Sequence, residues 1–378
     1  MNANKKILIV FPLLPKYDIE FFNCLSDFEC FDLYITANIE VQDQLTLENY
    51  DNLNYRVIHT KTKSIGPLTV TFGLGKIIKS IDPDLVIYSA SPRDFSQIYS
   101  MIKNKLLGRA VASWSMYHRI GGPIVFSTFY YKLLGHLSER NMCYSRIGKL
   151  YQVARGVDGG KIDVIGTAID QNKVFSCVAD GVNRIEAIKD RYNLENKTVL
   201  LQVVRLNEIK KPHILINMME SLLKKDDSFV LVLIGGGVLE DEIKEYVSKK
   251  TLNDNVMFLG PIYDEVEISA WFKLSDIFVI PTCIGLSAHH AFCYSLPIVT
   301  DDSVTNQASE FDILSDEFNC LLYKEGDLEH FSEQILRLKN NKPLYEEISN
   351  NALKTVRDIY TIENKAHNFL KSVKKILK

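Results

Sequence analysis

Short apolar runs alternate with longer stretches of helical spacing through the first part of the chain. The apolar runs predict strands at Lys6–Phe11, Phe31–Thr36, Tyr55–His59, Leu85–Tyr88 and Ala110–Trp114. Between strands, apolar residues three and four positions apart predict helices over Thr71–Ser80 and Ser96–Leu107. This alternation is typical of a parallel sheet with helices on both faces.

The same alternation begins again in the second half. It predicts strands at Thr198–Val204, Phe229–Ile234, Val256–Leu259, Ile277–Ile280 and Pro297–Thr300. It predicts helices at Pro212–Lys225, Glu240–Lys249, Asp264–Leu274 and Ser287–Tyr294, and a helical tail after Asp327. We therefore expect an α/β protein of two Rossmann-like, doubly wound domains, residues 1–172 and 173–359, with a linker near 168–182. Two such domains in series predict an interdomain cleft, where ligands bind at the carboxyl ends of strands.

Composition and charge narrow the class of protein. A chain of 378 residues is long enough for two domains, and a net charge of −3 gives no reason to expect nucleic acid as a partner. Seven cysteines without C-x-x-C spacing are typical of reduced thiols in a cytosolic protein. No apolar run resembles a signal sequence or reaches the ~20 residues of a membrane span. We expect a cytoplasmic protein, with a peripheral position on the cytoplasmic membrane left open.

One segment departs from this even balance of charge. Between Arg93 and Arg155 there are ten Lys or Arg residues, two acids and ten aromatic residues. Basic residues interleaved with aromatic ones suit an anionic membrane surface or a phosphorylated or sugar acceptor. Solvated helix faces with aromatic core stripes explain the same composition, so the segment leaves both interpretations open.

Candidate chemistry lies after the predicted strands of the second half. Arg205 and Lys210 follow the first of these strands, where their charges suit a diphosphate that gains negative charge as a bond breaks. Two surface cations that have no shared role would give the same sequence pattern. The run Gly235–Gly237 follows the next strand and suits close approach of a nucleotide, although a tight turn explains it equally well.

A third feature joins the strand that ends near Ile280 to the helix that opens at Ser287. A helix start with unpaired backbone N–H groups is suited to phosphate. The adjacent His289 and His290 point in different directions on a helix and are poor partners for one metal ion. Because no metal-ligand motif occurs elsewhere, we expect no protein-bound metal.

Five blocks of the second half occur in a recognisable order. They are Arg205–Lys210, Leu233–Gly237, Val256–Gly260, Ser275–Pro281 and Gly285–Asp301, followed by Asn319–Leu322 and Glu325–Asp327. In this order they resemble the retaining family-4 glycosyltransferases (glycosyl transferases group 1) of GT-B fold. Val164–Asp170 resembles the segment that ends the first domain of that family, and the rest of the first half matches more loosely.

The resemblance implies a reaction and a set of roles. A sugar would pass from a nucleotide-diphosphate sugar, with retention, to a hydroxyl of a glycan or lipid-linked oligosaccharide in surface polysaccharide biosynthesis, with no separate cofactor. Residues 1–172 would bind the acceptor, residues 173–359 the donor, and the last helix, 360–378, would pack on the first domain. The implied catalytic residues are Arg205, Lys210 (with Lys211 beside it) and His118. The implied donor contacts are Gly236, Thr282, Gly285, Leu286, Ser287, His290 and Glu310.

The chain also departs from the family pattern at two of these positions. Thr282 and His290 stand where the family usually has glutamates that support the donor sugar and the ribose, and Glu310 is the nearest later acid. This motivates a noncatalytic, sugar-nucleotide-binding or partner-binding relative as an alternative. A nucleotide-sugar epimerase fits the ordered blocks less well, and a nicotinamide oxidoreductase lacks its glycine fingerprint.

Overall fold

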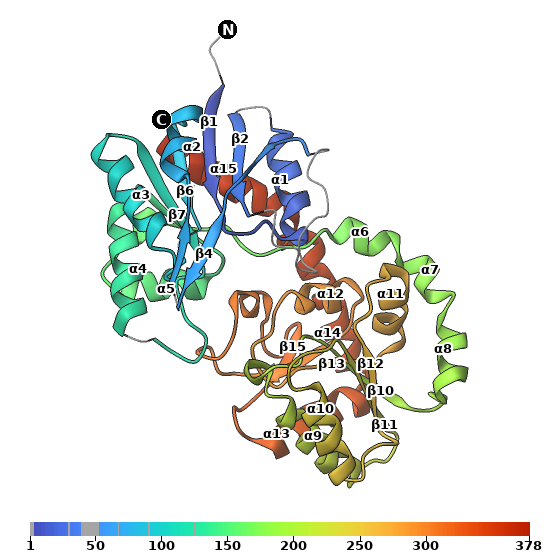
Figure 1. The fold of residues 1–378 in the computed structure, drawn as a ribbon. Helices are drawn as coiled ribbons and strands as arrows, with labels where there is room; N and C mark the ends of the chain where they lie inside the picture. Colours follow the sequence, from blue (N-terminus) through green and yellow to red (C-terminus); the bar gives the residue numbers. More distant parts are fainter. Residues whose placement is uncertain (1–3, 29–30, 39–52, 67, 90, 124) are drawn as a thin grey trace. The chain divides into compact units, whose positions relative to one another are not determined.

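The computed structural model describes residues 4–28, 31–38, 53–66, 68–89, 91–123 and 125–378. The chain forms two compact units, residues 1–170 with 362–378 and residues 171–361 (Figure 1). Each unit is built around its own parallel sheet, so the α/β class predicted from the alternation is confirmed. Cys30 lies outside the described residues, and the six described cysteines are free thiols.

The first unit contains a seven-stranded sheet in the order β3-β2-β1-β6-β7-β8-β9, parallel throughout. In that order the strands span Arg56–His59, Phe31–Ala37, Lys5–Val10, Leu85–Tyr88, Ala110–Ser115, Arg140–Cys143 and Ile162–Val164. Its helices are α1 (Ile19–Ser26), α2 (Leu74–Ile81), α3 (Phe95–Leu106), α4 (Val125–Leu137), α5 (Arg146–Ala154) and α15 (Ile362–Ile376), with short 3-10 turns at Lys16–Asp18 and Gly159–Lys161. The central strands are buried apolar runs, as both faces of a parallel sheet are covered.

The last helix, α15, belongs to the core of this unit although it comes almost 200 residues after β9. Phe369 packs against Phe21 and Trp114, with ring centroids 5.8 and 5.4 Å apart. Lys365 forms a buried ion pair with Asp18 at 3.0 Å and lies over the Phe21 ring. Lys375 of the same helix pairs with Asp163 at 2.6 Å, so the amphipathic helix is held by its apolar face and by two charge pairs.

One prediction in the first half is wrong at its start, and one strand was missed. Residues predicted to open a helix at Thr71 instead end a hairpin of β4 (Thr62–Ile65) and β5 (Leu68–Thr71), and α2 begins at Leu74. The β-branched residues before Phe72 favour a strand, and Gly73, with φ of 84°, separates it from the helix. Strand β8 was not predicted because it is short and begins with Arg140 and Asn141, which give no apolar run.

The second unit contains a six-stranded parallel sheet in the order β12-β11-β10-β13-β14-β15. In that order the strands span Val256–Gly260, Phe229–Ile234, Thr198–Val203, Ile277–Val279, Ile298–Asp301 and Cys320–Tyr323. The first helices are α6 (Gln171–Ser176), α7 (Val178–Val182), α8 (Ile185–Tyr192), α9 (Pro212–Leu223), α10 (Glu240–Lys249) and α11 (Glu265–Leu274). Then come α12 (Ser287–Cys293), α13 (Leu328–Asn340) and α14 (Lys342–Lys354), with short 3-10 turns η3 (Glu208–Lys210) and η4 (Ser309–Ile313) and one π-helical turn, Thr355–Ile359.

Chain order reverses within this sheet at β10, which pairs with β11 on one side and β13 on the other. Such a reversal is where open α/β sheets bind ligands, at the carboxyl ends of the strands. Among the described residues, no helix combines the length and the apolar composition that a bilayer crossing requires.

Candidate functional site

The candidate residues of the second unit gather at one edge of its sheet. They follow the carboxyl ends of β10, β11 and β13, and β14 ends at Asp301 at the same edge. Four segments distant in sequence therefore converge where the strand order reverses, as expected of a ligand site in a doubly wound sheet.

Arg205 is held at this edge by the backbone on either side of it. Val204 donates its N–H to the Ile234 carbonyl at 3.0 Å, and Leu206 donates to the Gly236 carbonyl at 2.9 Å. The Arg205 side chain is exposed and forms no ion pair with a carboxylate of the described residues. Its full charge is therefore available to an anionic ligand.

The glycines at 235–237 explain how the loop that carries Arg205 comes so close to the end of β11. A Cβ added at Gly235 would lie 2.0 Å from the Val204 carbonyl oxygen, and one at Gly237 would lie 2.1 Å from the Leu206 oxygen. Only glycine permits these contacts, and Gly235 also has φ of 120°. Gly235 and Gly237 are thus required for the close packing of the two loops. A Cβ added at Gly236 would approach only the side chains of Glu240 and Pro261.

Lys210 ties the first loop to the turn after β13. Asn207 caps the short helix η3 by accepting the Lys210 N–H at 3.3 Å. The Lys210 ammonium donates to the Cys283 carbonyl and lies 3.8 Å from where a Gly285 Cβ would be. The structure therefore brings Lys210 and Gly285 together, and no carboxylate of the described residues pairs with this ammonium, whereas Lys211 pairs with Glu325 at 3.5 Å.

The turn at Gly285–Ser287 presents unpaired donors beside that ammonium. Ala288 and His290 donate their N–H groups to the carbonyls of Gly285 and Leu286. In the described part of the chain, the N–H groups of residues 285, 286 and 287 have no acceptor. Backbone donors next to the charged Lys210 ammonium form a suitable environment for a phosphate or a sugar hydroxyl.

A buried carboxylate and an amide support the same turn, and the sequence did not identify either as functional. Gln307 accepts the Ile284 N–H at 2.8 Å and donates to the Asp301 carboxylate at 2.6 Å. It also donates to the Asp301 carbonyl and the Thr300 hydroxyl. Three acceptors on one side fix the orientation of the amide, so its oxygen must face Ile284. The only signal in the sequence was an acid at the end of a predicted strand.

Thr282 lies beside this carboxylate. Burial raises the pKa of Asp301 to about 6, although the Thr282 hydroxyl and the Gln307 amide partly oppose the increase. Thr282 itself is buried. A carboxylate is therefore present next to the position where the resemblance led us to expect a glutamate, but it comes from a neighbouring strand.

The two histidines of α12 have different surroundings. His289 is fully buried, with its ring 6.3 Å from that of Tyr360. His290 is half-buried and stacks on Phe272 with ring centroids 6.0 Å apart. Burial lowers the pKa of His290, so its ring is neutral at pH 7. The ring can therefore form a hydrogen bond with a ligand but offers no charge.

Of the remaining candidates, Glu310 lies in the second unit and His118 in the first. Burial raises the pKa of the Cys283 thiol, and Glu310, in η4, is near enough for its charge to add to this effect. His118 belongs to the first unit, where it is buried, stacks on Tyr151 at 5.8 Å and has Nδ1 3.1 Å from the Met116 carbonyl. In the residues that the structure describes, no three His, Cys, Asp or Glu side chains are grouped as metal ligands would be.

Comparison with known proteins connects this site to a family. Residues 184–355 match the family model described as glycosyl transferases group 1. The putative glycosyltransferase YtcC of Bacillus subtilis is 26% identical over 189 residues, 47% of this chain and 45% of that protein. The poly(ribitol-phosphate) alpha-N-acetylglucosaminyltransferase of Staphylococcus aureus is 24% identical over 176 residues. That alignment covers 46% of this chain and 34% of the relative, so the chain spans less than half the length of either protein.

Solved structures extend the likeness to the whole chain. The Anabaena protein Alr3699/HepE in complex with UDP superposes with a TM-score of 0.77 and 13% identity, covering 98% of this chain and all of that one. A glycosyltransferase from Rickettsia africae has a TM-score of 0.77 and 17% identity over the full length of both chains. At such identities the likeness concerns the fold, and it confirms the predicted GT-B class.

Proposed function

We propose that the chain transfers a sugar from a UDP-sugar to a hydroxyl group, with retention at the anomeric carbon, because residues 184–355 match the glycosyl transferases group 1 model. The observation that carries the proposal is the pair of cations at the strand-order reversal, Arg205 and Lys210, which have no carboxylate partner among the residues that the structure describes. The UDP bound by the Anabaena protein supports uridine diphosphate as the leaving group.

The chemistry needs charge stabilisation more than a protein nucleophile. As the glycosidic bond breaks, the diphosphate gains negative charge, which Arg205 and Lys210 offset. The backbone donors of Gly285, Leu286 and Ser287 hold phosphate oxygens and donor hydroxyls. No metal ion has a part in this proposal.

Thr282 and His290, which stand where the family usually has glutamates, contact the donor without a carboxylate of their own. Thr282 and Asp301 together stand in for the glutamate that would support the donor sugar. His290, neutral at pH 7, hydrogen-bonds the ribose, and Glu310 and Gly236 complete the donor contacts. In the first unit, His118 serves the acceptor.

The acceptor is a glycan or lipid-linked oligosaccharide in the biosynthesis of a surface polysaccharide. The poly(ribitol-phosphate) named for the Staphylococcus aureus relative supports a polymer as the acceptor class. We place the protein in the cytoplasm, where it meets the inner face of the membrane through residues 93–155. The excess of basic residues in that segment supports this position.

Turnover of purified protein tests the proposal. A panel of UDP-sugars is incubated with membrane extract as acceptor, and release of UDP and labelled glycan is measured. We expect release with one donor, lowered at least about 100-fold in Arg205→Ala, as for the loss of one group that stabilises the transition state. Lys224→Ala, which removes an exposed lysine at the end of α9, is the matched control and should keep full activity. Equal turnover by Arg205→Ala would refute the role of Arg205.

A noncatalytic donor-binding relative is the second candidate. The observation that favours it is the neutral pair Thr282 and His290 where glutamates were expected. This candidate predicts saturable UDP binding without turnover of any donor, whereas transfer to any acceptor would exclude it.

A further inference from the structure

Helix α3 of the first unit presents an apolar stripe to solvent. Phe95, Tyr99, Ile102 and Leu106 are 49%, 69%, 37% and 83% exposed. Their spacing of four, three and four residues places them on one face of the helix. The helix buries Met101 in the core, as a surface helix normally does, but it also leaves this second apolar stripe exposed.

The inner face of α3 places Met101 in the core beside polar residues that are hydrogen-bonded, and these bonds fix the orientation of the helix. Gln97, Ser100 and Asn104 are buried. Asn104 donates to the Ser100 carbonyl at 2.8 Å and to the Tyr88 hydroxyl at 3.2 Å, and Gln97 donates to the Asp94 carboxylate at 3.1 Å. Turning the apolar stripe inward would break these bonds and leave buried polar groups without partners. The stripe is therefore a stable feature of the surface.

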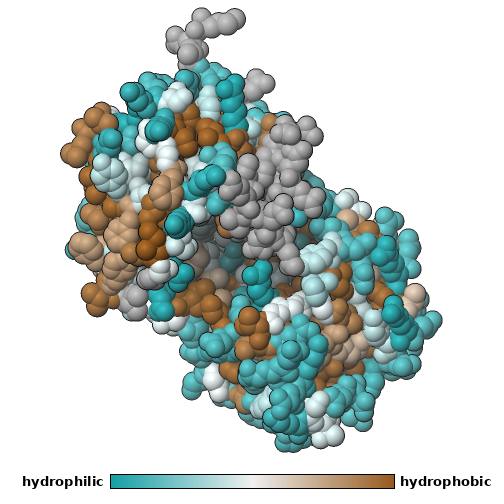
Figure 2. All heavy atoms as spheres, in the orientation of Figure 1, coloured by the Kyte–Doolittle hydropathy of each residue, from teal (hydrophilic) through white to brown (hydrophobic). Residues whose placement is uncertain are grey.

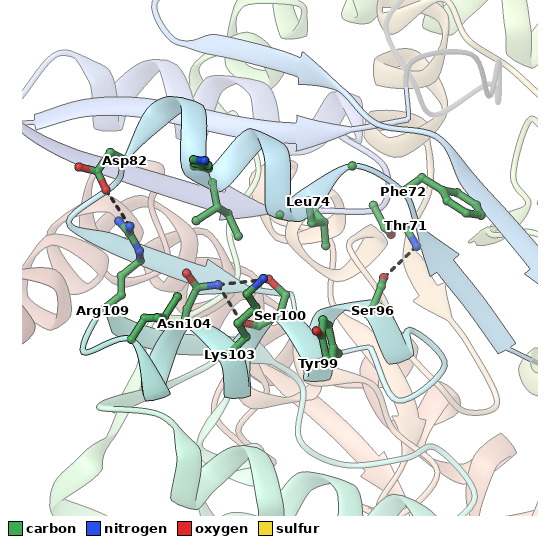
Figure 3. Close-up of a pocket in the computed structure, with 15 residues that line it drawn as sticks. Thr71, Phe72, Leu74, Asp82, Ser96, Tyr99, Ser100, Lys103, Asn104 and Arg109 are labelled. Atoms are coloured by element: carbon green, nitrogen blue, oxygen red, sulfur yellow. Dashed lines mark hydrogen bonds and ion pairs between the residues drawn. The ribbon is translucent and has the colours of Figure 1, made fainter.

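A groove runs between α2 and α3 beside this stripe (Figure 3). Its volume is about 430 Å³, and Leu74, Ile78, Tyr99 and Leu107 contribute apolar walls. The polar groups of its floor are already bonded to one another, as the dashed lines in Figure 3 show for Asn104 and Ser100. The groove offers apolar contact, and its volume is in the range of ordinary ligand pockets.

The apolar surface continues onto α4. Val125, Phe126 and Phe129 are 89%, 52% and 66% exposed. Figure 2 shows the hydrophobic residues of this unit gathered over α3 and α4. An exposed apolar patch of this kind marks an interaction surface.

The charges around the groove select the partner. Lys76, Lys79 and Lys103 are exposed on α2 and α3 and have no carboxylate partner among the described residues. The exposed acids nearby are neutralised, since Asp82 pairs with Arg109 at 2.7 Å and Glu139 with Lys105 at 2.9 Å. Free cations around an apolar surface complement negative headgroups above hydrocarbon.

We propose that the α3 stripe and the α2–α3 groove form a docking surface for an anionic phospholipid bilayer, with one acyl chain in the groove and Lys76, Lys79 and Lys103 at the lipid phosphates. The exposed aromatic rings of Tyr99 and Phe95 lie at headgroup level, where amphipathic rings are favoured. This inference rests on the proposed function, in which the acceptor is delivered at the same membrane.

Vesicle sedimentation with the full chain tests the proposal. We expect binding to phosphatidylglycerol vesicles, little binding to phosphatidylcholine vesicles, and a steep loss between about 50 and about 300 mM salt. Tyr99→Ser/Leu106→Ser should weaken binding at least about tenfold. Val238→Ser, which replaces an 88% exposed apolar side chain in the second unit, should change nothing.

A second variant tests the groove. Apart from its chain neighbours and the backbone of its own helix, nothing lies within 4 Å of the position of a Gly75 Cβ, so Gly75→Leu extends into the groove without a clash. It should lower binding to phosphatidylglycerol vesicles about threefold or more, by displacing the acyl chain. Thermal stabilisation by UDP, measured on each variant, shows that the protein is folded and tests the donor site separately. Failure to bind UDP while vesicle binding is retained would count against the proposed function alone.

Three results would overturn the inference. One is absence of vesicle binding at low salt, and another is equal binding of wild type and Tyr99→Ser/Leu106→Ser. The third is a dimer of the wild type that this variant abolishes in the absence of vesicles, since a second copy would then cover the stripe.

Discussion

Replacing Asp301 by asparagine is expected to stabilise the second unit, by an amount that grows with pH. Asp301 is 1% exposed, and burial raises the pKa of its carboxyl from an ordinary value of 3.8 to about 6. An acid whose pKa is raised by folding favours the folded state below its ordinary pKa, and that contribution is lost as pH rises through the folded value. Above pH 6, the folded unit therefore bears the cost of an ionised buried carboxylate.

The size of this cost follows from the two pKa values. At 1.36 kcal/mol per pKa unit, the difference between 3.8 and about 6 is worth about 3 kcal/mol at pH 8. At pH 5, where the folded carboxyl is mostly protonated, the same relation gives about 1.5 kcal/mol. Asparagine keeps an oxygen to accept the Gln307 amide and does not titrate, so Asp301→Asn should gain stability by these amounts.

Urea unfolding at pH 5 and pH 8 measures the effect. Trp114 and Trp271 are the two tryptophans, one in each unit, so in a Trp114→Phe background fluorescence reports on the second unit. Asp227→Asn, at an exposed acid before β11, is the control and should stay within about 0.5 kcal/mol at both pH values. A gain in the free energy of unfolding that does not increase with pH, or a loss of stability at pH 8, would show that Asp301 does not ionise at a cost in the folded unit.

Three further substitutions test other parts of the structure. Gln307→Met removes the acceptor of the Ile284 N–H and should weaken UDP binding about tenfold or more in calorimetry; unchanged affinity would mean that the turn does not need this support. Lys365→Ala leaves a buried carboxylate unpaired and should destabilise the first unit by about 3–5 kcal/mol in urea, whereas Lys371→Ala, at an exposed position of the same helix, should not; equal stabilities would contradict the assigned ion pair. Gly237→Ala forces a Cβ against a carbonyl oxygen at 2.1 Å and should lower thermal stability and UDP affinity together; a wild-type melting temperature would show that the loops separate at little cost.

The sequence predicted the strands and helices well where burial produces a continuous pattern. Phe229–Ile234 is buried along its whole length and was predicted with its observed bounds. Strands of three or four residues with polar members, such as Arg140–Cys143, give too little pattern. Their positions depend on contacts such as the Arg140–Asp163 ion pair, which join residues distant in sequence.

Periodicity also does not tell which face of a helix is buried. The spacing of apolar residues from Phe95 to Leu106 correctly predicts a helix, but the same spacing is expected of a core stripe and of an exposed one. In α3 the hydrogen bonds of the polar face decide the question.

The candidate site was predictable only in part, for a similar reason. Arg205 and Lys210 follow a strand, so their place at the sheet edge could be inferred from sequence order. The support of the turn by Asp301 and Gln307 could not, because it depends on two loops meeting through one amide side chain.

Calorimetric titration of UDP into the purified chain tests the central claim most directly. We expect saturable binding, weakened about 10- to 150-fold in Arg205→Ala, as for the loss of one hydrogen bond to a charged group. Lys224→Ala should bind UDP like the wild type. Absence of UDP binding, or equal affinity of wild type and Arg205→Ala, would contradict a donor site at this edge of the sheet.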